Sequence, residues 1–257
     1  MAAFNVKLSA SFAVLCIIVP VVTPQFQNFQ QGRGQTDEAR KAAFRRQGEQ
    51  NMRELKGLIA SGGWTVDVDD FISKVKVSSK FVPKYNRTVI RSTAIRKDVS
   101  ATDVIEEGLK YPGDVVNYNQ DTDFLKILET LDPKNRIIHA QVTPKGGFDI
   151  PSRESVSLQT WDYEGDAFYF AYSSVDYPVP LRDGIIRVTT YPSGTKIRPL
   201  KPSGVEITAI INIDAKPPGG VQQEVIDIFT KYKQVSFYEE FFNYIQRKYA
   251  SKKAGRR

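Results

Sequence analysis

The chain has 257 residues, enough for one large domain or two small ones, and 41% of them are hydrophobic, which excludes a wholly disordered protein. Its net charge of +7 comes from 36 basic and 29 acidic side chains. The single cysteine, Cys16, and the single histidine, His139, exclude an intrachain disulfide framework and a zinc site of Cys and His ligands. The sequence therefore indicates no metal site and no cofactor.

Residues 1–24 are expected to be a signal peptide or a short anchor. The mostly apolar run Ala10–Val22 follows Lys7, and it is too short for an ordinary transmembrane helix but fits the apolar core of a signal peptide. Pro24 makes the cleavage site after Thr23 a poor one, so an uncleaved anchor and a cytoplasmic chain with no targeting segment stay open as alternatives. Residues 25–36 are rich in Gln and Gly and are expected to form a polar linker.

Secretion would have two chemical consequences. Cleavage would remove Cys16, so that the mature protein would have no cysteine. Asn86, in the chain's N-x-S/T sequon, would become a glycosylation site, although an unused sequon is an equal alternative.

From residue 37 to residue 249 the pattern predicts one α+β domain. A helix should begin at Thr36–Glu38 and run to about Ala60, covering a surface rather than filling a core. A second, short helix is expected at Ala101–Leu109. Alternation of apolar and polar residues predicts strands at Trp64–Val68, Val75–Val82, Arg87–Arg96, Phe124–Thr130, Arg136–Val142, Ser155–Tyr163, Ala167–Ser174, Gly184–Thr190 and Val205–Ile213.

A long helix, at about Val221–Lys248, is expected to end the domain. Its apolar residues fall at helical spacing and predict a core-facing stripe, for which a curved sheet would supply the partner surface and leave room for a cavity. The stripe consists of Val221, Val225, Ile228, Phe229, Tyr232, Tyr238, Phe241, Phe242 and Ile245.

Much of the positive charge is concentrated at the C-terminal end. Arg247–Arg257 holds six basic residues and no acidic one, and the rest of the chain is close to neutral. The body is therefore not expected to bind nucleic acid. Residues 250–257 are expected to be a basic tail that docks on an anionic membrane surface, with a solvated, disordered tail as the alternative.

Five short motifs along the chain resemble those of the START (steroidogenic acute regulatory protein-related lipid-transfer) domain family. Ile-Pro-Ser-Arg-Glu-Ser-Val at Ile150–Val156 is similar to the family's Pro-Arg-Asp-Phe-Val, and Gly-Ile-Ile-Arg-Val at Gly184–Val188 is similar to its Gly-x-Val-Arg-Ala. Tyr172–Pro178 resembles the Ser-Val-x-x-Pro stretch. Pro192–Leu200 resembles Pro-Ser-Gly-x-x-Ile-x-Pro-Leu, and Ile213–Lys216 resembles the turn before the last helix.

The resemblance implies a helix-grip fold, in which a curved antiparallel β-sheet grips a long C-terminal α-helix around a lipid tunnel. It also implies non-catalytic binding and transfer of a single hydrophobic lipid, such as a sterol or a phospholipid, by a monomer. Two alternatives stay open: a secreted protein that only sequesters lipid, and a lipid-processing enzyme. No GxSxG nucleophile motif supports the enzyme.

The resemblance also suggests lipid-contacting residues. Phe124 and Gln159 match the positions of a buried acid and arginine in sterol carriers, so they are expected to meet and to keep the tunnel uncharged. The arginine of phosphatidylcholine carriers has no counterpart ahead of Tyr118. The candidate tunnel or lid residues are Tyr118, Phe124, His139, Phe148, Arg153, Gln159, Phe229, Tyr238 and Phe241.

Three of these expectations concern particular positions. Alternation places His139 opposite Ile138, and either an ordinary hydrogen bond or a head-group contact fits it. Arg153 follows a loop and precedes Glu154, so an ion pair at the rim of the tunnel is expected. The Gly-rich loop Thr143–Asp149 lacks the ending of a phosphate-binding loop, and it matches the mobile loop that closes the tunnel in the family.

Overall fold

The computed structural model of this chain describes residues 37–143, 151–217 and 222–254. The expected targeting segment, the linker and all but the first residue of the Thr143–Asp149 loop lie outside these ranges. The helices are α1 (Asp37–Ala60), α2 (Ala101–Lys110), α3 (Gln223–Ala254) and the 3-10 helices Pro83–Tyr85 and Pro112–Asn117. The strands are β1 (Thr65–Asp70), β2 (Val75–Val82), β3 (Arg87–Arg96), β4 (Thr122–Asp132), β5 (Asn135–Val142), β6 (Arg153–Glu164), β7 (Ala167–Ser174), β8 (Ile186–Arg187), β9 (Thr189–Thr190), β10 (Ser193–Pro199), β11 (Val205–Ile211) and β12 (Ile213–Asp214).

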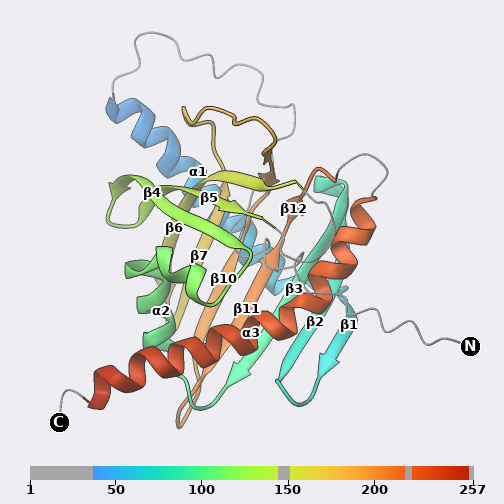
Figure 1. Cartoon of the computed structure of the whole chain (residues 1–257), viewed down its shortest axis with the longest axis vertical. Coiled ribbons are helices and arrows are strands. Elements are labelled where there is room, and N and C mark those ends of the chain that lie inside the picture. The colour runs from blue at the N-terminus through green and yellow to red at the C-terminus, as the bar shows by residue number, and fades with distance from the viewer. Residues whose placement is uncertain (1–36, 144–150, 218–221, 255–257) are drawn as a thin grey trace, which may run out of the picture.

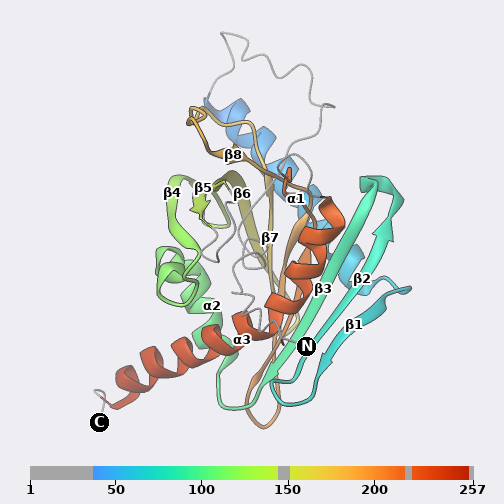
Figure 2. The ribbon, with the colours of Figure 1, turned by 45° about the vertical axis from the view of Figure 1, so that its right-hand side comes forward.

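Ten strands form one curved sheet, in the order β1-β2-β3-β11-β10-β7-β6-β5-β4, with β8 paired to β6 outside this path. All pairs in the path are antiparallel, and β8 lies parallel to the first residues of β6, with Arg153 opposite Ile186. Figures 1 and 2 show the open, twisted sheet with α3 lying across one face and α1 behind the other. The predicted α+β helix-grip architecture is confirmed.

The main core lies between the inner face of the sheet and α3, because the strands turn one row of aliphatic side chains toward that helix. Ile138 and Ala140 of β5 and Ile207 of β11 are buried there against Phe241 and Phe242 of α3. Two smaller clusters lie on the outer face, where α1 packs. Their members are Met52, Leu55, Val89, Ala167, Tyr169, Ala171 and Ile210 in one, and Leu131, Ile137, Val156, Leu158 and Val175 in the other.

Helix α1 approaches the outer face closely because it carries a glycine at the contact. A Cβ on Gly48 would collide with the side-chain oxygens of Thr160 on β6 and Asn135 on β5. Because Thr160 Oγ1 donates a hydrogen bond of 2.6 Å to Asn135 Oδ1 beneath the helix, a larger residue at position 48 would push α1 off the sheet.

Several expected elements differ from the observed ones. The expected single strand Gly184–Thr190 is wrong as a continuous strand, since only the short pieces β8 and β9 are paired. β10 was not expected, because its polar sequence does not alternate with period two. The expected stripe on α3 is wrong at its N-terminal end, where Val225, Ile228 and Tyr232 are exposed. Within the described ranges, no helix is long and apolar enough to cross a membrane.

Candidate functional site

Strand β6 presents different chemistry on its two faces. Val156 and Leu158 belong to the outer cluster beneath α1, so by alternation Glu154 points outward as well. Arg153 lies opposite Val142 of the main core and points inward. One central strand therefore carries polar residues on both faces of the sheet.

The inward-facing residues of β6 form a buried polar row. Arg153, Ser155, Ser157 and Gln159 have relative exposures of 1%, 0%, 0% and 4%. Buried polar atoms normally have hydrogen-bond partners, yet Nη2 of Arg153 and Oγ of Ser157 have none among the described residues. The two amide atoms of Asn212 and Oγ1 of Thr189 are also buried without a partner in these parts of the chain. The inner face of β6 thus has two buried residues, Arg153 and Ser157, with polar atoms that have no partner among the described residues.

Two buried arginines lie on this inner face, and they differ in how many hydrogen bonds they make. Arg136 donates to Oε1 of Gln159 at 2.7 Å and to the carbonyl oxygens of Leu109 and Gly108 at 2.7 and 2.8 Å. Those carbonyls belong to the last turn of α2, where the helix dipole favours a cation. Burial lowers the pKa of Arg136 to about 10, so it stays charged at neutral pH.

Arg153 is held far less completely. Its Nη1 donates to the carbonyl oxygen of Pro151, two residues away. Burial lowers the pKa of Arg153, and no carboxylate among the described residues contributes to that pKa shift. The guanidinium therefore carries a buried positive charge that these parts of the chain do not balance.

Aromatic side chains form the opposite wall. The Tyr118 ring lies 5.1 Å from that of Phe241 and 6.1 Å from that of Phe237, both on α3. Tyr238, also on α3, lies 3.1 Å through its hydroxyl from Oγ of Ser92, which donates to Oε1 of Gln234 at 3.1 Å. This wall is mainly aromatic. The contacts of Ser92 with Gln234 and Tyr238 are polar and join β3 to α3.

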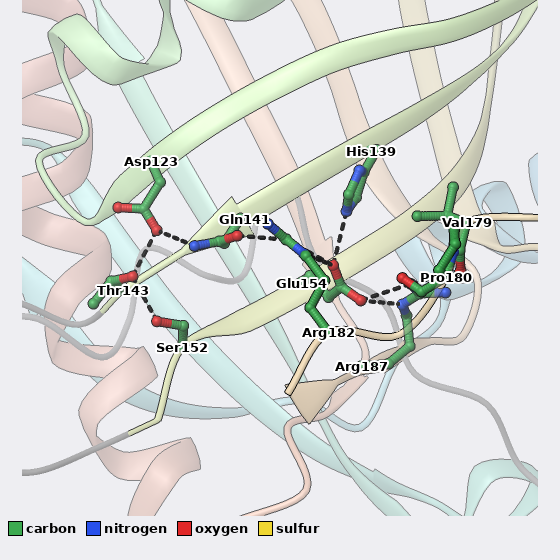
Figure 3. Close-up of polar contacts among 10 residues, drawn as sticks. All are labelled: Asp123, His139, Gln141, Thr143, Ser152, Glu154, Val179, Pro180, Arg182 and Arg187. Carbon is green, nitrogen blue, oxygen red and sulfur yellow. Dashed lines mark hydrogen bonds and ion pairs between the residues drawn. The ribbon is translucent and has the colours of Figure 1, made fainter. Parts of the chain in front are cut away.

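Figure 3 shows the second group, which surrounds Glu154 on the outer side. Glu154 is fully buried and accepts hydrogen bonds from Arg187 at 2.6 Å and from Arg182 at 2.8 Å. Its Oε2 also lies 3.0 Å from Nε2 of His139. Arg187 donates as well to the carbonyl oxygens of Val179 and Pro180, so the carboxylate ties the long β7–β8 connection to β5 and β6.

The outer group extends to the end of β5. Gln141 donates to Asp123 at 2.9 Å, and its Oε1 accepts a hydrogen bond from Arg182. Oγ1 of Thr143 donates to Asp123 at 2.6 Å and lies 2.7 Å from Oγ of Ser152. These contacts join Thr143, after β5, and Ser152, before β6, to the same network.

The charges of the outer group are balanced. Burial by itself would raise the pKa of Glu154, but hydrogen bonds from Arg182, Arg187 and His139 outweigh it and lower the pKa. Burial also lowers the pKa of His139, and the two arginines add to that effect while Glu154 opposes it. Neutral His139 therefore acts as a hydrogen-bonding partner of a carboxylate.

The expected pair of Phe124 and Gln159 is wrong. Phe124 pairs with Gln141 and packs edge-on against His139, at 5.0 Å between ring centroids, whereas Gln159 pairs with Arg136. The two lie on opposite faces, with β5 between their strands. The expectation of an uncharged interior is wrong too, since Arg136 and Arg153 are both buried.

Two more expectations need correction. Arg153 is not in an ion pair at a rim: it points inward, and Glu154 next to it pairs with other arginines on the outer face. His139 makes the ordinary hydrogen bond, to Glu154, and it lies on the outer face rather than toward a ligand in the core.

The other candidate residues are distributed as follows. Tyr118, Tyr238 and Phe241 come together on the inner side, and Phe229 is a half-buried residue of α3. Phe148 lies outside the described residues. Asn86 is exposed, in a left-handed turn at φ 51° between β2 and β3.

Sequence reasoning did not identify Ser157, Arg136 or Asn212. Asn212, between β11 and β12, is fully buried. The run of alternate polar residues at 153, 155, 157 and 159 was the available signal, but it could not be distinguished from a solvent-facing row. No cluster of three or more His, Cys, Asp or Glu side chains that could hold a metal ion occurs in the described parts of the chain.

A long helix held across the inner face of a curved antiparallel sheet defines a helix-grip protein. The START domain profile matches residues 47–251, and the chain belongs to this family of lipid-binding and lipid-transfer domains. No curated protein matches it significantly in sequence.

Solved structures share the fold. Human StAR-related lipid transfer protein 5 matches with a TM-score of 0.73 and 17% identity, over 81% of this chain and 99% of that chain. Human STARD10 matches with a TM-score of 0.65 and 15% identity, over 79% and 84%. The STAR-related lipid transfer protein of Xanthomonas axonopodis matches with a TM-score of 0.58 and 18% identity, over 72% and 99%.

Proposed function

We propose that this protein binds one lipid molecule between the inner face of its sheet and α3, and transfers it between membranes without altering it. The observation that carries the proposal is the combination of an aromatic wall on α3 with buried polar atoms that have no partner among the described residues of the inner face. Each methylene removed from water contributes about 0.8 kcal/mol, and a few polar contacts fix the head.

The non-catalytic part of the proposal rests on the chemistry around His139. Its Nε2 faces the Glu154 carboxylate, and no serine or threonine hydroxyl is paired with it in the described parts of the chain. Catalysis by a hydroxyl nucleophile needs a base within hydrogen-bond reach of it.

Mass spectrometry of lipid that copurifies with the protein, followed by transfer between donor and acceptor vesicles, tests the function. Ala140→Leu, on the inner face of β5, should lower the amount of lipid bound, because it fills interior space. Gln141→Leu, its neighbour on the outer face, is the matched control and should bind like the wild type. Lipid extraction without delivery to acceptor vesicles would favour sequestration, and product formation from a bound lipid would favour an enzyme.

The basic tail is proposed to hold the protein on anionic membranes. Lys248 bonds to Glu107 and Asp114, both at 2.7 Å, so the charge proposed to meet the membrane is on Lys252, Lys253, Arg256 and Arg257. Each contributes about 1 kcal/mol near such a surface before screening by salt. Changing these four residues to Gln should slow transfer from phosphatidylglycerol vesicles and leave transfer from phosphatidylcholine vesicles unchanged. Equal slowing on both would contradict the docking role.

Secretion is proposed from the N-terminal segment and the exposed position of Asn86. Expressed through a eukaryotic secretory pathway, the full chain should lose mass on treatment with an N-glycosidase. Thr88→Ala, which removes the sequon and leaves the left-handed turn at Asn86 intact, should abolish that loss. A chain retained in the cytoplasm with no mass change would contradict secretion.

A further inference from the structure

Arg153 is the one described arginine of the inner face whose charge is left without compensation. Arg136 has three neutral oxygen acceptors, two of them at the negative end of α2, while Arg153 has one neighbouring carbonyl and an Nη2 with no partner among the described residues. The Arg153 side chain is 99% buried, so water at the surface cannot solvate it.

A buried charge without a partner costs several kcal/mol, and proteins rarely keep one unless something binds to it. Glu154, the nearest carboxylate in sequence, cannot serve, because it points to the other face and accepts hydrogen bonds from Arg182, Arg187 and His139. No carboxylate among the described residues is therefore placed to balance Arg153, and the proposed lipid between the sheet and α3 is the candidate partner.

We infer that Arg153 binds the negatively charged head of an anionic lipid, and that the ligand class is a long-chain monoanion, such as a fatty acid carboxylate or a phosphodiester. This inference rests on the proposed function and narrows its ligand. A monoanion matches the single positive charge, and one free N–H edge fits one oxygen of the head, while the aromatic wall on α3 covers the chain.

The shared chemistry of the two heads is an anionic oxygen, and two comparisons of lipids separate the possibilities. Oleate and oleyl alcohol have the same chain and differ in the charge of the head. Oleate should bind about 10- to 100-fold more tightly at pH 8, as expected for a hydrogen bond to a charged group. Vesicle extraction of phosphatidylglycerol, against phosphatidylcholine with the same chains, tests a phosphodiester head of net charge −1, because the choline cation of phosphatidylcholine neutralises the same phosphodiester.

Arg153→Met removes the charge and keeps the length of the side chain. It should bind oleate and oleyl alcohol equally. The control Arg182→Gln, which removes an arginine from the outer face, should keep the preference for oleate.

A second readout needs no ligand. Because Arg153→Met removes an uncompensated buried charge, the delipidated variant should melt about 2–4 °C above the delipidated wild type, and oleate should raise the melting temperature of the wild type more than that of the variant. If Arg153→Met does not fold, Arg153→Gln and the comparison of oleate with oleyl alcohol on the wild type give the same test.

Equal binding of oleate and oleyl alcohol by the wild type would overturn the anion site and leave the carrier function standing. A preference for oleate that survives Arg153→Met would overturn the role of Arg153. If the wild type binds neither probe and extracts neither phospholipid, the anion site is wrong, and the carrier function is then judged by whether any copurified lipid is found. Extraction of phosphatidylglycerol without oleate binding would support the phosphodiester head alone.

Discussion

Arg153 and Glu154 are neighbours in sequence, and the pleat of β6 sends them to opposite faces of the sheet with opposite outcomes. Outside, one buried carboxylate meets a histidine of β5 and two arginines, and the arginines tie the β7–β8 connection to the sheet. Inside, one buried arginine meets a single carbonyl among the described residues. Both residues are 1% exposed or less, so burial does not explain the difference.

The comparison shows how this fold uses charge. The outer network is complete without a ligand, so its role is architectural: it anchors the β7–β8 connection and Thr143 at the end of β5. The inner row is incomplete, and the remaining bonds are free for whatever occupies the interior. Stability should therefore depend mainly on the outer face, and ligand choice on the inner face.

The largest expected effect comes from breaking the outer network. Glu154→Gln removes the negative charge and leaves two arginines facing each other. The free energy of unfolding should fall by about 3 kcal/mol, the low end of the range of about 3–5 kcal/mol for breaking a buried ion pair. The loss is at the low end because Arg182 is 43% exposed, so water can solvate its charge. Urea denaturation at pH 7 measures this. A loss below 1 kcal/mol would mean that the network does not stabilise the fold.

The second expected effect contrasts the two inner arginines. Arg136→Met should destabilise the protein by about 2 kcal/mol, since it leaves two carbonyls of α2 and Gln159 without a donor. The matched variant Arg153→Met should stabilise the ligand-free protein instead. Equal losses in the two variants would mean that Arg153 has a structural role like that of Arg136.

A third, smaller effect tests which residues touch. In double-mutant cycles, Phe124→Ala and Gln159→Ala should add to within about 0.5 kcal/mol, because they lie on different faces with β5 between their strands. Gln159→Ala and Arg136→Met share a 2.7 Å hydrogen bond and should show a coupling of about 1 kcal/mol. A coupling energy between Phe124 and Gln159 would mean that the two side chains are in contact, which contradicts the observed strand register.

The sequence was sufficient for the elements with a strong period. The bounds of Val75–Val82, Arg87–Arg96 and Ala167–Ser174 were predicted to the residue. The position of Phe124 relative to Gln159 was not predictable, because it depends on strand register and on bulges in β4. Alternation assigned the two faces of β5 correctly, but nothing in the pattern said which face would meet α3 and which α1.

The same limit applies to Arg153. A pair such as Arg153-Glu154 suggests an ion pair to anyone who reads the sequence alone, yet adjacent residues of a strand point apart. Glu154 instead pairs with Arg182 and Arg187, which lie in the β7–β8 connection and in β8. The course of such a connection depends on tertiary contacts, which local sequence propensity does not reveal.

The smallest expected effect is a pH dependence of the outer network. His139 has a lowered pKa in the folded protein, so between that pKa and the ordinary value of 6.5 the unfolded chain binds more protons than the folded one. The free energy of unfolding should therefore fall as the pH drops below about 6.5, with a slope of at most about 1.4 kcal/mol per pH unit, the value for one proton. The lowered pKa of Glu154 acts in the same direction but only below its ordinary value of 4.5, which keeps the two windows apart. Urea denaturation between pH 5.5 and 8 measures the slope. His139→Gln keeps a donor for Glu154 and cannot titrate, so it should flatten the curve across that range, and an unchanged slope would assign the pH dependence to another group.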